Sequence, residues 1–432
     1  MHDAATLRLV RLLAAAAFAS SASMRVCDPL LPALAAEFGA SLAQAAAVNA
    51  GFAIAYGVLQ LAIGPLADRA GKARVVRAAT GLAAAASLAC AAAPGLDWLV
   101  LARVVAGGVG GAIIPVAFAW IGDEVPYDVR QGVLARVMSG GLLGLVFGQL
   151  IGGVLVDAVG WRWAFVALAG LFAVVAVRLA ASAAARPAAA AGGPRGAGAS
   201  GEPVASAEPV ASAEPVAPAD PRETAGAHAP IHPLALLRDY ADIARPRWSR
   251  VVLACVMLEA LLMYGAVSFV PSALHAGFGI ALWQAALVSA TVGVGGFVYT
   301  LFAARLIAGL GERRLSAAGG ALAASGLLLL AASSAPWMSV AACLALGLGF
   351  YGFHNTLQVH GTQLSSSRRG MGTALFALAM FVGQSAGVAL GSVAVAFAGF
   401  EPAFAASGVA FGLLTVGFVG ALARRAAAGT RH

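Results

Sequence analysis

The sequence has 432 residues, of which 61% are apolar and only 11% are charged, and its formal net charge is +8. Apolar side chains at this density exceed what a soluble core needs, so transmembrane helices are indicated and a soluble globular class is excluded. The positive charge would suit nucleic acid, but the basic residues are grouped in short segments between long apolar runs, and we expect no nucleic-acid partner.

Twelve apolar runs are long enough to cross a bilayer, since about 20 helical residues span its hydrocarbon core. They are apolar all round and too long for strands, which argues against a barrel. A cleaved signal peptide is an alternative for the first run, although eleven further runs make an uncleaved span more natural. The predicted fold class is an all-α membrane protein with spans at 12–34, 46–66, 74–93, 98–121, 133–156, 162–183, 251–272, 283–308, 315–334, 337–359, 371–398 and 402–423.

Basic residues alternate between the two sides of these spans. If both termini are cytoplasmic, most arginines and Lys72 lie on the cytoplasmic side, whereas Glu37 and Glu401 mark outer loops. This asymmetry follows the positive-inside rule. It predicts a multi-pass protein of the cell (inner) membrane with both termini in the cytoplasm.

A dense polar hinge joins the second and third runs. Its two glycines allow the backbone to turn, and its charges follow closely on one another. Two interpretations stay open: a cytoplasmic turn with positive-inside charge, or a gate in which the acid pairs with arginines or faces a helix N-terminus. The hinge positions are Gly64, Asp68, Arg69, Gly71, Lys72 and Arg74.

The middle of the chain differs from its flanks. Residues 184–230 are rich in proline and alanine and repeat Glu-Pro-Val-Ala-Ser-Ala, which predicts a disordered linker. In residues 231–250, Leu234, Leu237, Tyr240 and Ile243 share one helical face. We expect an amphipathic helix on the cytoplasmic membrane surface, with a plain linker as the alternative.

The flanks resemble one another. Gly148-Gln149-Leu150-Ile151-Gly152 matches Gly383-Gln384-Ser385-Ala386-Gly387, and two further pairs of segments match in the same order. A six-plus-six chain with a linker between its halves is a transporter architecture. The predicted bundles are residues 1–183 and 251–432, the second including the tail.

Two motifs carry a resemblance to the major facilitator superfamily. The hinge from Gly64 to Lys72 is similar to that family's loop signature, and Arg103 with Gly107 is similar to its fourth-span motif. The resemblance covers both halves and leaves out the linker. It implies two six-helix halves that rock about a midplane site, with spans 1, 4, 7 and 10 lining the cavity. These spans carry, one each, Asp28, Arg103, Glu259 and His354.

Span five carries a glycine at every fourth residue, which makes a smooth stripe for close helix contact. In the family, a proline-containing form of this motif is associated with exporters. Here Gln149 stands in place of the proline and puts an amide in mid-membrane. The predicted packing positions are Gly144, Gly148, Gln149 and Gly152, with Gly383, Gln384 and Gly387 in the second half.

Spans of the first half carry Arg25, Asp28 and Arg103, and a charge within a span is costly and so indicates function. Arg25 and Asp28 are three residues apart and share a helix face. Counting from the outer ends places Asp28 and Arg103 at similar depth, so that they could meet. A structural ion pair and a proton-coupling site are both open.

The candidate site residues of the second half are one acid and three polar residues of span ten. Glu259 is the only acid in its spans and lies about mid-bilayer, where it could carry a proton or be a satisfied structural acid. His354, Asn355 and Gln358 share one face of span ten. They could line the cavity or bond between helices.

The predicted function is secondary active transport by alternating access, and not enzymatic. No phosphate-binding glycine-lysine motif supports ATP drive, and no catalytic or metal-binding constellation is recognisable at local spacing. We expect proton-coupled efflux of a small amphiphilic molecule by a monomer, with protons and membrane lipid as further partners and no cofactor. The alternatives are a proton-coupled importer and, after it, a polytopic membrane enzyme or a channel.

Overall fold

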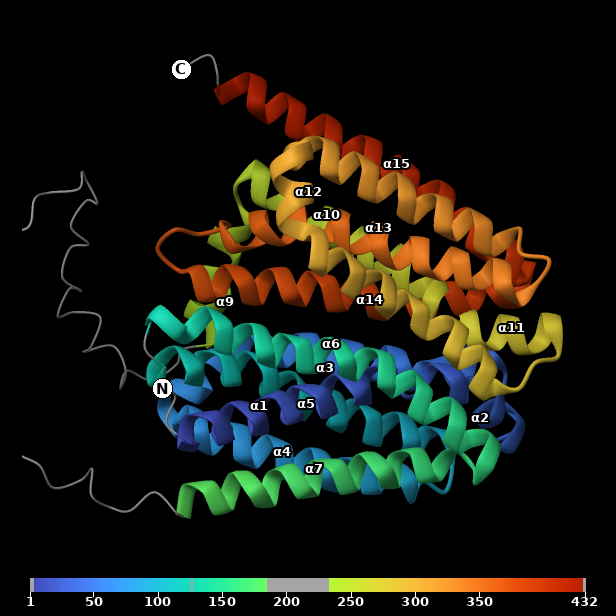
Figure 1. The fold of residues 1–432 in the computed structure, drawn as a ribbon, viewed down its shortest axis with the longest axis horizontal. Helices are drawn as coiled ribbons and strands as arrows, with labels where there is room; N and C mark the ends of the chain where they lie inside the picture. The colour runs from blue at the N-terminus through green and yellow to red at the C-terminus, as the bar shows by residue number, and fades with distance from the viewer. Residues whose placement is uncertain (1–3, 126, 185–232, 430–432) are drawn as a thin grey trace, which may run out of the picture.

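The computed structural model describes residues 4–125, 127–184 and 233–429, and the predicted all-α membrane fold is confirmed (Figure 1). The first half contains α1 (Ala4–Arg25), η1 (Asp28–Leu30), α2 (Leu31–Glu37), α3 (Leu42–Ala70), α4 (Lys72–Ala91), α5 (Leu96–Glu124), α6 (Tyr127–Ala158) and α7 (Trp161–Ala184). The second contains α9 (Pro233–Ala244), α10 (Arg247–Val267), α11 (Val270–Phe278), α12 (Leu282–Ala331), α13 (Pro336–Thr362), α14 (Arg369–Ala398) and α15 (Phe400–Gly429). The expected disordered linker falls, apart from Ala184, outside the described residues.

Among the described residues, eleven helical segments are long and apolar enough to cross a membrane. One of them, α12, has 50 residues. At 1.5 Å per residue it would measure about 75 Å, more than twice the thickness of the hydrocarbon core. Gly311 interrupts it with φ 67° and ψ 171°, and the chain turns back there (Figure 1). It therefore holds the two spans predicted at 283–308 and 315–334.

The first span of each half, predicted over 12–34 and 251–272, lies within an apolar helical segment, Leu7–Glu37 or Arg247–Phe278, and the helix is broken inside that segment. α1 ends at Arg25, before η1 and α2, and α10 ends at Val267, before α11. Pro29 and Pro271 stand in the first turn of the new segments. A proline lacks the N–H that would continue the helix, and its ring clashes with the carbonyl one turn back. The break recurs at the same place in both halves.

The bundle has two ends, which we name by their loops. The linker face holds α9 and the turns at Gly71, Gly311 and residues 363–368, together with both described chain ends (Figure 1). The distal face holds the turns at residues 38–41, 92–95, 159–160, 279–281, 332–335 and Gly399.

Helix contacts in each half are made backbone to backbone through glycines. In α6, a Cβ added at Gly144 or Gly148 would lie less than 3.0 Å from a carbonyl of α1. In α14, Gly383 and Gly387 face carbonyls of α10 equally closely. A side chain at these positions would force the helices apart.

We expect Gly144→Ala to destabilise the protein, because its new methyl group would meet the Phe18 carbonyl oxygen. Overpacking of this kind costs about 1–3 kcal/mol in unfolding free energy. Thermal unfolding of the purified protein would measure it. Gly170→Ala is the matched control, since nothing lies within 4 Å of a Cβ there. Equal melting temperatures for the two variants would contradict the close packing of α1 and α6.

Candidate functional site

Asp28 lies buried at the break between α1 and α2, where its carboxylate contacts three hydrogen-bond donors. Its carboxylate is 2.9 Å from the Arg25 guanidinium, 2.9 Å from Asn49 Nδ2 and 3.0 Å from Gln149 Nε2. The donors come from α1, α3 and α6. A buried charge is stable when it is both paired and hydrogen-bonded, and this carboxylate meets both conditions. Asn49 did not figure in the predicted site, although an asparagine within an apolar run was an available signal.

Arg103, fully buried in α5, does not pair with Asp28 as its depth suggested. Its Nη1 donates to the Ser23 backbone oxygen at 3.0 Å, and its guanidinium lies 4.0 Å from the centre of the Phe52 ring. Because α1 ends at Arg25, the Ser23 carbonyl is among the last four of that helix, which lack an intrahelical donor. Arg103 thus supplies a hydrogen-bond donor to a backbone carbonyl at the C-terminal end of α1.

A second buried charged group lies in the other half. Glu259 of α10 is 0% exposed, and its Oε2 lies 2.9 Å from Nδ1 of His354 in α13. Its Oε1 has no hydrogen-bond partner among the described residues. Of the three residues expected on one face of α13, His354 contacts Glu259, Asn355 is half-buried and Gln358 is exposed.

Aromatic rings connect the two groups across the boundary between the halves. The Arg25 guanidinium lies 5.4 Å from the ring centre of Tyr264, which belongs to α10. Tyr264 meets Phe350 edge-on at 6.3 Å, and Phe350 stacks on His354 at 5.3 Å. A line of rings therefore runs from the Asp28 cluster to the Glu259 pair.

A small cavity of about 40 Å³ lies beside this line, with Arg25, Gln149, Tyr264 and Tyr351 in its wall. Each water occupies about 30 Å³ in the liquid, so the cavity has room for about one. An organic substrate would require the halves to separate. Gln384, the counterpart of Gln149, is buried in α14, and its Oε1 has no hydrogen-bond partner among the described residues.

The halves touch mainly in the middle of the bundle and toward the distal face. Ser385 Oγ donates to the Ala50 backbone oxygen at 3.0 Å, and the Trp283 backbone N–H donates to Asp157 at 2.8 Å. A Cβ at Gly57 would lie less than 3.0 Å from Phe381. These contacts join α3 to α14 and α6 to α12.

At the linker face, α9 contacts both halves. Tyr240 donates its hydroxyl hydrogen to the Leu61 backbone oxygen of α3 at 3.0 Å, and Asp239 pairs with Arg368 at 2.6 Å. Tyr240 and Ile243 are buried, whereas Leu237 is 59% exposed. α9 therefore connects the two halves at the linker face.

Lys72 connects the hinge at Gly71 to the end of α5 by an ion pair. Lys72 Nζ lies 2.6 Å from Asp123 at the end of α5 and 3.9 Å from Asp68, whose side chain is 64% exposed. Gly71 has φ 87°, a conformation that favours glycine. Arg74 donates to the Ala70 backbone oxygen at 3.0 Å. Asp123, an acid at the end of the fourth span, was missed in the sequence and is the strongest partner of Lys72.

Comparison with known proteins gives this geometry its context. The sequence model of the Major Facilitator Superfamily matches residues 13–366. The Multidrug resistance protein B homolog of Mycobacterium tuberculosis is 37% identical over 130 residues, 30% of this chain and 24% of that protein. The Multidrug export protein EmrB of Haemophilus influenzae is 29% identical over 165 residues, 38% of this chain and 32% of that protein. The matched region thus spans a third or less of these relatives' own length.

Solved structures with the same fold cover nearly the whole chain. An inward-facing bacterial homolog of the human lysosomal transporter Spinster superimposes with a TM-score of 0.71 at 17% identity, over 97% of both chains. The nucleoside transporter NupG gives a TM-score of 0.72 at 12% identity, over 97% of this chain and 99% of its own. With the family model that matches residues 13–366, this shows that the chain belongs to the Major Facilitator Superfamily.

Proposed function

We propose that this transporter exports small amphiphilic molecules in exchange for protons. The observation that carries the proposal is the buried Glu259–His354 pair, 2.9 Å apart and joined by aromatic rings to the other half. A carboxylate and an imidazole in contact can hold or release a proton with little movement of atoms. The names of the multidrug relatives favour export and an amphiphilic substrate.

The proposed mechanism is alternating access, in which residues 1–183 and 251–432 move as two bodies. The contacts toward the distal face hold that side together, and α9 contacts both halves at the linker face, so only the small cavity beside the rings lies between the halves in this conformation. Opening the distal side requires those contacts to break and the line of rings at Tyr264 to separate. Proton transfer at Glu259 changes the charge beside that line and so biases the equilibrium between the two conformations.

We further propose that the linker face is cytoplasmic and that the protein works as a monomer in the cell (inner) membrane. The hinge at Gly71, the turns at Gly311 and residues 363–368, and the stretch between the two halves together carry most of the basic residues between spans, as the positive-inside rule requires of a cytoplasmic side. Residues 184–230 then form a cytoplasmic linker, and 231–250 an amphipathic cytoplasmic segment.

Inverted membrane vesicles test the function directly. Their lumen is acidified, candidate amphiphiles are added outside, and substrate-dependent proton release is recorded with a pH-sensitive dye. Release that requires both the protein and the compound supports antiport. Proton uptake that accompanies substrate uptake in right-side-out vesicles, with no release in inverted ones, would support an importer instead.

We expect Asp68→Asn to slow the transport cycle about tenfold, or about 1.4 kcal/mol in activation free energy, while the protein still inserts and folds. An exposed ion pair contributes about 0–1 kcal/mol to stability, and Lys72 keeps Asp123 as its nearer partner. Transport rates and membrane yield should be compared with those of Asp123→Asn. Normal transport by Asp68→Asn would leave the hinge as a plain turn and not a gate.

A further inference from the structure

The distal corner of the first half is closed by a polar network. Glu37, the last residue of α2, accepts a hydrogen bond from Trp161 Nε1 at 2.6 Å and pairs with Arg162. Arg162 also donates to the Ala93 backbone oxygen at 3.2 Å. The network joins α2, α7 and the turn after α4.

The second half repeats the backbone of this corner but not its side chains on α11. α2 is followed by Phe38 and Gly39, with φ 59° at the glycine, and α11 ends in Phe278 before Gly279, with φ 65°. The residue before the phenylalanine is Glu37 in the first half and Gly277 in the second. The carboxylate that anchors the first network is therefore absent from α11.

The helix that begins at this corner also differs between the halves, because its second residue is basic in α7 and acidic in α15. α7 begins after Gly160, which has φ 99°, and α15 begins after Gly399, which has φ 89°. The first two residues are Trp161 and Arg162 in α7, but Phe400 and Glu401 in α15. An acid thus replaces the base that pairs with Glu37.

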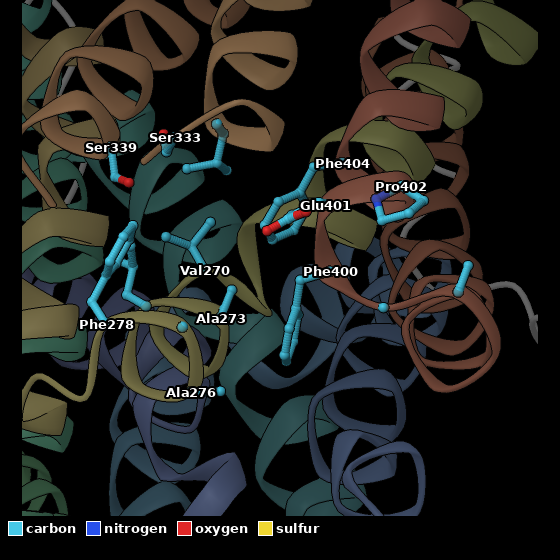
Figure 2. A pocket seen from close by; sticks show the side chains of 15 residues that line it. Val270, Ala273, Ala276, Phe278, Ser333, Ser339, Phe400, Glu401, Pro402 and Phe404 are labelled. Atoms are coloured by element: carbon cyan, nitrogen blue, oxygen red, sulfur yellow. The ribbon is translucent and has the colours of Figure 1, made fainter. Parts of the chain in front are cut away.

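A cavity of about 450 Å³ occupies the corner that these substitutions leave open. Figure 2 shows Phe400, Glu401 and Phe404 on one side of it, and Val270, Phe278 and Ser339 on the other. This volume lies within the range of small-molecule pockets, about 300–1,000 Å³. A Cβ at Gly277 would meet nothing within 4 Å, and the buried Ser339 Oγ has no hydrogen-bond partner among the described residues.

We propose that this distal pocket is a second binding site, which takes an organic monocation with an apolar body from the aqueous phase. The rings of Phe278, Phe400 and Phe404 offer aromatic surface, and Glu401 offers one carboxylate. Glu401 stands in the first turn of α15, in the wall of the pocket. The residues that line the pocket include no lysine or arginine, so a phospholipid phosphate would find no basic partner.

Binding of tetraphenylphosphonium to the purified full-length protein tests this site. Equilibrium dialysis in phosphatidylglycerol nanodiscs gives the number of sites and their dissociation constants. Glu401→Gln should weaken one site about tenfold. Gly277→Glu with Glu401→Arg rebuilds the network of the first half and should remove that site. Asp97→Asn, which changes an exposed acid in the first turn of α5 at the same face, is the matched control and should bind like the wild type.

The outcomes separate this site from the transport site. A site that persists in Glu259→Gln, but is weakened by Glu401→Gln and absent from the double variant, is the distal pocket, whether or not the protein exchanges protons. Wild-type binding by Glu401→Gln overturns the proposal even if the double variant fails to fold. Binding that disappears when phosphatidylethanolamine is added to the nanodiscs also overturns it, because a lipid ammonium would then be the occupant.

Discussion

Glu259→Gln is expected to abolish transport driven by a pH gradient while the protein stays folded. Glutamine has the shape of glutamate and can keep a hydrogen bond to His354, but it cannot take up or release a proton at this site. We expect substrate-dependent proton release to fall to the background of empty vesicles. Downhill movement of substrate should persist and lose its dependence on pH, because the two halves can still rock.

The stability of this variant should be unchanged or slightly higher. Glu259 is fully buried and its Oε1 has no hydrogen-bond partner among the described residues, so an ionised side chain is costly there. A neutral amide removes that cost. Thermal unfolding of wild type and variant, measured on the same preparations as transport, separates a loss of coupling from a loss of protein.

Glu312→Gln is the matched control for this experiment. Glu312 also pairs with a histidine of α13, His360, but it lies at the linker face with its side chain 51% exposed. Because water can replace its partner, its removal should leave pH-driven transport in place. If Glu259→Gln retains full pH-driven transport, the proton path does not pass through Glu259, and if both variants lose it, the effect is not specific to the buried pair.

The length and composition of the spans were predictable because a bilayer imposes them. Apolar runs of about 20 residues identified the crossings, and the repeated motifs identified the two halves. The breaks after Arg25 and Val267 were missed because the apolar runs continue through them. Pro29 and Pro271 were the available signals, but a proline near the end of a span is also compatible with an unbroken helix.

The partners of each buried charge were not predictable, because they depend on how the helices rotate and cross. Asp28 meets Gln149, 121 residues away, and Arg103 meets a backbone carbonyl, which no sequence pattern marks. The two equivalent glutamines show the same limit. Gln149 bonds to Asp28, whereas Gln384 stands between Gly383 and Gly387, which face Met257 and Leu261 in the middle of α10, and its Oε1 has no hydrogen-bond partner among the described residues.

Asp28→Asn is expected to lower stability by about 3–5 kcal/mol, the usual cost of leaving one member of a buried ion pair unpaired. Asparagine would keep the shape of the side chain but replace one acceptor oxygen with a donor. That donor would face one of the three groups that now donate to Asp28: Arg25, Asn49 or Gln149. Thermal unfolding and the yield of monodisperse protein measure the loss.

A double variant decides what the Asp28 cluster is for. Arg25→Gln with Asp28→Asn removes both charges, so no unpaired charge stays buried and most of the lost stability should return. Return of stability together with pH-driven transport would identify a structural ion pair. Return of stability without pH-driven transport would place the pair in the coupling mechanism, because the fold then no longer needs the charges and the transport cycle does. A single Asp28→Asn variant as stable as the wild type would exclude the structural role.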